Sequence, residues 1–298
     1  MARPVQPIEQ VVTGFKPMVP REDIIANVRS CLARGLPTLQ PGRYVDATAI
    51  MCGGGPSLTA GIPRILDLQA RPNTFTLAVK GAWRALLPAG VRVDFVCMID
   101  PDPSQVDYID DLPPDIEAII ASCCAPEVFD ALRHHRVTTF HIPMGSHTPP
   151  DLYPKGSVGA QGGPAVGSRS LRAAYRLGAE RLHLFGYDNS FCEAKPGETE
   201  PPPVPTHNYI LAKGGQTKMR VDCGDKAFWA TPVMAGECHD ITTWYISGSA
   251  PAMTVYGDGM LAYNFHKVRR FADANPEHRS MLGHVYRSGA PDIKEIAA

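Results

Sequence analysis

The segment Thr48–Leu58, which reads TAIMCGGGPSL, decides the fold that the sequence predicts. An apolar run ends in the glycines Gly53–Gly55, and Pro56 and Ser57 follow at the start of sequence that suits a helix. Glycine allows positive φ and a close approach to a ligand, and proline is favoured at the first helical position. The segment therefore predicts a buried strand, a tight turn and a helix whose first N–H groups suit a phosphate. The alternative is a plain strand-to-helix turn.

Short apolar runs alternate with helix-like segments around this turn. The expected strands are Ala47–Cys52, Thr74–Val79, Val93–Ile99, Ala118–Ser122, Val137–Ile142, Arg181–Phe185 and Met253–Tyr256. The expected helices include Arg21–Leu32, Gly81–Leu87, Pro126–His134, Pro164–Leu177 and Met234–Ser247. Because the strand runs are apolar on both faces, they suit a parallel sheet buried under helices. We predict an α/β fold, Rossmann-like, with a mostly parallel sheet and helices on both faces.

The pattern changes after Gly186, where a proline-rich stretch at 192–206 cannot form a regular element and suits a flexible or lid-like loop. Next, Gln216–Val221 and Lys226–Thr231 flank a short polar turn and predict a β-hairpin. The expected organisation is an N-terminal extension with one helix (1–45), the Rossmann-like domain (46–275) with the loop and hairpin inserted at 190–232, and a C-terminal tail (276–298).

Composition excludes several classes of protein. The 298 residues are 44% hydrophobic and carry a net charge of −1, so no basic field favours nucleic acid. The N-terminus has no apolar signal region and the chain has no run of about 18 apolar residues, so we expect no secretory signal and no membrane span. The eight cysteines include no CxxC pair, which favours reduced thiols and a cytoplasmic location.

Common nucleotide-binding motifs do not fit the glycine turn. Leu58 stands where the dinucleotide fingerprint needs its last glycine, and Lys80 stands where that fingerprint expects an acidic residue. The chain also lacks the Gly-Lys-Ser/Thr of a P-loop. NAD binding and ordinary P-loop chemistry are therefore not expected.

Polar residues that follow the strands are the other candidates, because ligands of open α/β sheets bind at the carboxyl ends of the strands. Asp100 and Asp102 flank Pro101 after one strand, and both carboxylates are candidate ligands of a Mg²⁺ ion on phosphate oxygens. The alternative is an Asp-Pro turn with an aspartate cap. Lys80 is either a phosphate partner or a solvated loop lysine.

Three further segments complete the candidate site. Gly162 and Gly163 precede Pro164 in a second glycine-rich loop that leads into a helix; it is either an anion site or a flexible surface loop. Asp188 follows a strand and is a candidate ligand or general base, with a cap as the alternative. His207 is a candidate catalytic or substrate-binding group, although a lone histidine is more often structural.

The predicted residues divide into three groups. The catalytic candidates are Asp100, Asp188 and His207. The metal candidates are Asp100 and Asp102. The candidates for nucleotide or phosphate binding are Gly53, Gly54, Gly55, Pro56, Ser57, Lys80, Gly162 and Gly163.

As a set, these segments resemble the 6-hydroxymethylpterin diphosphokinase MptE-like family (domain of unknown function 115), which also includes a domain of motility-associated flagellin glycosyltransferases. The resemblance rests on the order Gly53–Leu58, Val93–Val96 leading to Asp100, Ala173–Gly178, and Leu184–Asp188, and covers roughly residues 46–260. The Gly-Pro-Ser-Leu turn is also similar to one in bacterial CMP-sialic-acid-dependent sialyltransferases. The family often has Asn where this chain has Lys80, which leaves recognition of the base or ribose open.

The resemblance implies a Rossmann-like domain and a nucleotide-bound donor, with a hydroxylated small molecule as acceptor. One expectation is transfer of a diphosphate from ATP, with Mg²⁺, to a hydroxymethyl acceptor of the pterin type. The second is transfer of a sugar from a CMP- or UDP-linked donor. The third is a non-catalytic protein that binds nucleotide or glycan.

Overall fold

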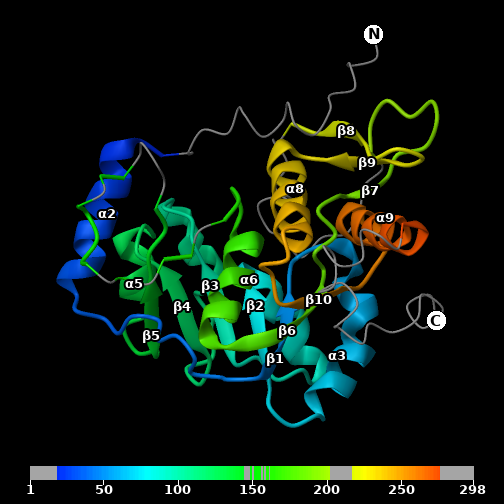
Figure 1. Cartoon of the computed structure of the whole chain (residues 1–298). Coiled ribbons are helices and arrows are strands. Elements are labelled where there is room, and N and C mark those ends of the chain that lie inside the picture. The colour runs from blue at the N-terminus through cyan, green and yellow to red at the C-terminus, as the bar shows by residue number, and fades with distance from the viewer. Residues whose placement is uncertain are drawn as a thin grey trace.

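The computed structural model describes residues 19–143, 148–149, 151–155, 157, 159–160, 162–201 and 217–275. Its centre is a seven-stranded sheet in the order β10-β6-β1-β2-β3-β4-β5, in which all neighbouring strands are parallel (Figure 1). The strands are β1 (Ala47–Cys52), β2 (Thr74–Val79), β3 (Phe95–Met98), β4 (Glu117–Ala121), β5 (Val137–Phe140), β6 (Ala179–Phe185) and β10 (Ala252–Val255). The predicted α/β, Rossmann-like fold is confirmed.

The helices connect the strands and cover the sheet. They are α2 (Arg21–Ala33), α3 (Ile62–Gln69), α4 (Trp83–Leu86), α5 (Pro126–Ala131), α6 (Val166–Leu177), α8 (Pro232–Ile246) and α9 (Met260–Ala274). The chain moves along the sheet in one direction from β1 to β5 and in the other from β6 to β10. Because βαβ crossovers are right-handed, the two directions place their helices on opposite faces. Accordingly, α6 and α8 contact each other.

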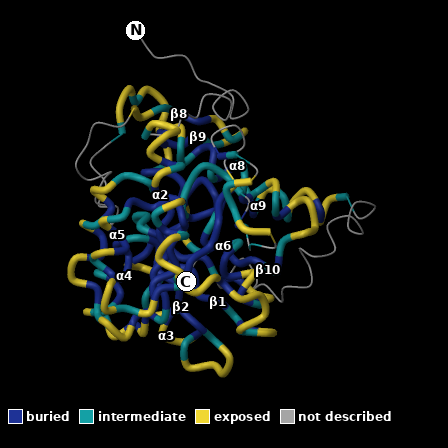
Figure 2. The backbone as a smooth tube through the Cα atoms, turned by 90° about the vertical axis from the view of Figure 1, so that its left-hand side faces the viewer, coloured by how far each residue is buried: buried dark blue, intermediate teal, exposed yellow. Residues whose placement is uncertain are grey.

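Apolar side chains from both faces of the sheet form one large core. Every residue of β3 and β4 is buried, and β1 and β2 each leave only one residue partly exposed. Helix α2 joins this core through Ile24 and Val28, which are both 0% exposed. Figure 2 shows the buried strands enclosed by exposed turns and helix faces. Parallel strands covered on both sides should be apolar throughout, as these are.

A small antiparallel sheet lies beyond the main one, in the order β7-β9-β8. Its strands are β7 (Cys192–Glu193), β8 (Met219–Asp222) and β9 (Ala227–Ala230). The β8–β9 pair is the predicted hairpin, and the sheet has a separate apolar cluster that includes Phe191 and Trp229. Among the described residues, no helix is both long enough and apolar enough to cross a bilayer.

Several predicted boundaries shift. The helix expected over Pro126–His134 ends at Ala131, and the helix expected from Pro164 begins at Val166. The sequence patterns do not predict helix α9, although Gly259 precedes it and its inner face is buried. The helix expected after the glycine turn begins as the 3-10 helix η1 (Pro56–Gly61) and continues as α3.

Candidate functional site

The candidate site lies at the carboxyl ends of β1 and β6, where the order of the strands reverses. From β1 the chain proceeds to β2 on one side, whereas β6 pairs on the other side. Connections leave a crevice at such a point, and ligands of open α/β sheets bind there. The turn after β1 and the turn after β6 therefore form the two sides of the candidate site.

These two turns are bonded to each other through the amides of the glycine turn. The Gly53 N–H donates to Phe185 O (2.8 Å), and the Gly55 N–H donates to Gly186 O (2.9 Å). The Ser57 N–H donates to Asp188 Oδ2 at 3.0 Å. A carboxylate of the protein thus occupies a position that the sequence predicts for a phosphate.

Close approach of the two turns explains two of the glycines. A Cβ on Gly53 would lie 2.5 Å from Gly186 O, and one on Gly55 would lie 2.6 Å from the same atom and also against the Asp188 carboxylate. Real side chains do not approach backbone this closely, so both positions require glycine. The density of glycine at this turn therefore has a structural cause besides any ligand.

Asp188 is the most enclosed acid of the site, with 4% of its surface exposed. Burial raises its pKa, the Ser57 N–H opposes this rise, and the negative charge of Asp258 adds to it. Gly257 and Gly259 also pack against Asp188, so the turn after β10 closes this side of the site. Asp188 holds three turns together and retains a carboxylate that is easier to protonate than usual.

Lys80 and Asp100 form an ion pair at the ends of β2 and β3. The Lys80 side chain is only 12% exposed, and its Nζ lies 5.2 Å from the centre of the Tyr108 ring. Burial alone would lower the pKa of Lys80, but Asp100 and Tyr108 outweigh burial and raise it. Lys80 also has a φ of 51°, a conformation that non-glycine residues adopt rarely and that is often found at functional sites.

Asp102 and Asp100 have different partners. Asp102 Oδ1 accepts the Ser104 N–H at 2.8 Å and caps the 3-10 helix η4 (Pro103–Tyr108), as the cap alternative predicts. Adjacent strands are about 4.8 Å apart, so β3 lies about 14 Å from β6, and Asp100 and Asp188 cannot hold one ion. In the described part of the chain, no group of three or more His, Cys, Asp or Glu could hold a metal.

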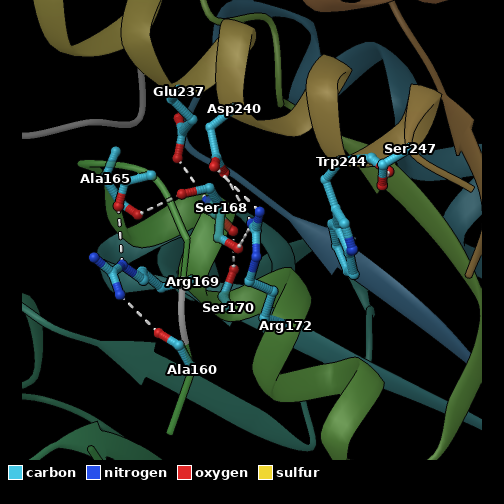
Figure 3. Close-up of polar contacts among 12 residues, drawn as sticks. Ala160, Ala165, Ser168, Arg169, Ser170, Arg172, Glu237, Asp240, Trp244 and Ser247 are labelled. Atoms are coloured by element: carbon cyan, nitrogen blue, oxygen red, sulfur yellow. Dashed lines mark hydrogen bonds and ion pairs between the residues drawn. The ribbon is translucent and has the colours of Figure 1, made fainter. Parts of the chain in front are cut away.

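The second glycine-rich loop leads into α6, and the start of this helix also binds a carboxylate. The Ser168 N–H donates to Glu237 Oε1 at 2.8 Å (Figure 3). The Asn189 side chain donates to Glu237 Oε2 at 2.7 Å. Burial raises the pKa of Glu237, while the bonds from Ser168 and Asn189 oppose the rise. A Cβ on Gly163 would lie 2.7 Å from Asp240 Cβ, so this glycine also permits close packing against α8.

A family model, "6-hydroxymethylpterin diphosphokinase MptE-like", matches residues 22–194. The chain belongs to the MptE-like family. The matched region contains the glycine turn, Lys80, Asp100 and Asp188, and it begins within α2. None of the curated proteins matches the chain.

The fold is similar to a solved structure, "Structure of MAf glycosyltransferase from Magnetospirillum magneticum AMB-1". The TM-score is 0.52 at 16% sequence identity, and the similarity covers 87% of this chain and 45% of that chain. The chain thus spans less than half of the length of this structural relative. At this identity the similarity shows the fold.

This MptE-like chain has two polar groups near the site that the sequence motifs do not indicate. Asn27 on α2 donates to Pro101 O and to Cys123 O, both at 3.1 Å, and so ties the turns after β3 and β4 together. Glu237 lies outside the family match and is brought to α6 by the packing of α8. For Asn27 the available signal was a polar residue on the otherwise apolar buried face of α2. His207 lies outside the described residues.

Proposed function

We propose that this MptE-like protein transfers a group from a nucleotide-bound donor, with ATP-dependent diphosphate transfer to a hydroxymethyl, pterin-like acceptor as the leading reaction. Family membership supports a transferase-type function. The observation that carries the proposal is the Lys80–Asp100 ion pair beside the crevice of the sheet, in which the lysine is enclosed and the carboxylate is partly exposed. A lysine ammonium beside a partly exposed carboxylate suits a phosphate chain and its counter-ion.

In this reaction the acceptor hydroxyl oxygen bonds to the β-phosphorus of ATP, the bond between that phosphorus and the α,β-bridging oxygen breaks, and AMP leaves. Lys80 would offset the charge that develops on the phosphate oxygens. Asp188, whose pKa is raised by burial, is the candidate acceptor of the hydroxyl proton, with His207 as the alternative.

Magnesium fits the acidic residues as an ion bound mainly by phosphate. Asp100 offers a partly exposed carboxylate and Asp102 keeps Oδ2 outside its capping bond. One or two carboxylates together with donor phosphates are a common environment for Mg²⁺ in proteins. When bound, the ion would neutralise donor charge, while Lys80 and the glycine turn orient the phosphate chain.

The test is release of AMP from ATP in the presence of Mg²⁺ and hydroxymethyl-dihydropterin. Asp100→Asn removes the charge beside Lys80 and should lower the rate roughly a hundredfold. Asp130→Asn is the control, because Asp130 also pairs with a basic side chain, Arg34, but is 66% exposed. An unchanged rate in Asp100→Asn would refute the role of this carboxylate.

Glycosyl transfer is the second candidate. Asp100, Asp102 and Asp188 do not converge, and a CMP-linked sugar has one phosphate and so less charge to neutralise than ATP. Transfer or hydrolysis of CMP- or UDP-sugars, with no AMP formed from ATP, would establish this reaction instead. Absence of nucleotide binding in calorimetry, with and without Mg²⁺, would contradict both.

A further inference from the structure

Two arginines on α6 have contrasting surroundings. Arg172 forms an ion pair with Asp240 at 2.8 Å, and its guanidinium lies 4.4 Å from the centre of the Trp244 ring. Arg169 instead donates to two loop carbonyls, from Nε to Gly163 O (2.9 Å) and from Nη1 to Ala160 O (2.7 Å). Figure 3 shows Arg172 extending toward Asp240 and Arg169 extending away from it.

Arg169 forms no ion pair within the part of the chain that the structure describes; the charge of Asp240, which pairs with Arg172, acts on it only from beyond ion-pair distance. No carboxylate there lies within ion-pair distance of its guanidinium, and burial lowers its pKa. Enclosing a charge without a counter-charge is costly, so enclosed guanidinium groups are normally paired. Of its five N–H groups, two bond to carbonyls of the described loop residues, and a guanidinium with further N–H groups suits a planar oxyanion.

A second unsatisfied group lies at the ends of the adjoining strands. His141, which follows β5, bonds through Nδ1 to Ser122 Oγ at 2.9 Å, and the two residues are 2% and 0% exposed. Its Nε2 is buried and has no partner among the described residues. Burial lowers the pKa of His141, which favours the neutral ring. If Ser122 donates to Nδ1, the ring proton lies on Nε2 as an unused donor.

The chain connects these two groups directly. The Ala160 N–H donates to His141 O at 2.9 Å, and Ala160 O accepts from Arg169. The Tyr153 ring lies 4.9 Å from the His141 ring, and the positive charge of Arg169 acts on the Tyr153 hydroxyl. Both groups therefore belong to one region near the ends of β4 and β5, and β4 adjoins the strand that carries Asp100.

We propose that Arg169 and His141 form an oxyanion subsite, which binds a carboxylate or phosphate carried by the transferred or accepting group rather than by the nucleotide. This inference rests on the proposed function and narrows its substrate class to acidic molecules. Arg169 binds the oxyanion through its planar fork, and His141 Nε2 donates the additional hydrogen bond. The glycine turn and Lys80 remain the site of the nucleotide phosphates.

The first test compares the melting temperature of the full chain in acetate, in inorganic phosphate and in chloride at equal ionic strength. An anion that binds only the native state raises the melting temperature, and the better of the two anions identifies the group. Arg169→Gln should remove the increase, whereas Arg172→Gln, which removes an equal charge from the same helix, should retain it. An equal increase in Arg169→Gln, or no increase in the wild type, would overturn the subsite.

His141 supplies an independent test should Arg169→Gln fail to fold. His141→Gln places an amide near the position of Nε2, whereas His141→Asn places one near Nδ1 and preserves only the bond to Ser122. His141→Gln should therefore bind the anion more tightly than His141→Asn, by about tenfold in dissociation constant. Equal affinities would contradict the role of Nε2.

Binding of ATP and of CMP, measured by calorimetry on the same proteins, separates the two proposals. Arg169→Gln should bind nucleotide as the wild type does while losing the effect of acetate or phosphate. Suppose that the wild type binds neither nucleotide, but that acetate or phosphate still raises its melting temperature in a way that depends on Arg169. The proposed function then fails and the subsite stands. If nucleotide binds but the anions have no effect, the subsite alone fails.

Discussion

Each of the two glycine-rich turns of this protein leads into a helix whose first N–H groups bind a carboxylate, but the two carboxylates come from different parts of the fold. The Ser57 N–H binds Asp188 at 3.0 Å, and the Ser168 N–H at the start of α6 binds Glu237 at 2.8 Å. Asp188 comes from the turn after the adjacent strand, inside the region that matches the MptE-like family model. Glu237 comes from α8, which lies outside that region.

The comparison shows that a helix start selects negative charge without selecting its source. Unpaired N–H groups and the helix dipole favour any anion, whether phosphate or carboxylate. At the first turn, the glycines bring Asp188 against the backbone of its own sheet. At the second, packing of α8 on α6 supplies Glu237. A bound phosphate at either turn would share these donors with a carboxylate or displace it.

The largest expected effect is that of Gly55→Ala. The new Cβ would overlap Gly186 O and the Asp188 carboxylate, so the free energy of unfolding should fall by about 3 kcal/mol. Urea denaturation measures this loss. Gly159→Ala is the control, because a Cβ there would meet its neighbours at an ordinary 3.6 Å. Equal stability of Gly55→Ala and the wild type would show that the two turns are not tightly packed.

The turn after β2 lies at the same edge of the sheet, but its left-handed position is occupied by Lys80 and not by a glycine. Asn tolerates the left-handed backbone at this position, so Lys80→Asn should change the free energy of unfolding by less than about 1 kcal/mol. It removes the ammonium, however, and should lower turnover roughly a hundredfold with whichever donor the wild type uses. Lys226→Asn, which breaks an exposed ion pair with Glu193, should leave turnover unchanged. Normal turnover in Lys80→Asn would rule out its role at the phosphates.

A third helix start, that of η4, is capped by a residue next to it in the sequence, Asp102, and not by a carboxylate from a distant part of the chain. Asp102→Ala removes the acceptor of the Ser104 N–H and should cost about 1 kcal/mol of unfolding free energy, which Asp102→Asn should largely restore. Thermal denaturation of the three proteins measures the difference. If the cost appears only when Mg²⁺ is present, Asp102 acts on the metal and not as a cap.

The smallest expected effect is on the pH dependence of stability. The folded protein raises the pKa of Asp188 above its ordinary value of 3.8, chiefly through burial. Between that value and the raised one the native state binds more protons than the unfolded state, so stability should fall as the pH rises through this window. Asp188→Asn should remove this slope, and Glu237→Gln should do the same above 4.5, the ordinary value of its carboxyl. Unchanged slopes in urea titrations would contradict the buried carboxylates.

Much of the sheet follows from local pattern. The strands expected at Ala47–Cys52 and Thr74–Val79 have the bounds seen in the structure, because continuous apolar runs between turn signals define buried parallel strands. The other strands shift by one or two residues at their ends, where hydrogen bonding to a neighbouring strand decides. Helix α9 was missed because its polar residues obscure an apolar face that α8 and β10 cover.

For the site, the sequence by itself placed Lys80, Asp100 and Asp188 at strand ends, since strand ends follow from local composition and the carboxyl ends of parallel strands share one edge. Only the tertiary structure decided their partners: Lys80 with Asp100, Asp188 with Ser57, and Glu237 with Ser168. Such pairs join residues up to 131 positions apart, and their formation depends on the order of the strands and the packing of helices. Periodicity along the chain carries no information about either.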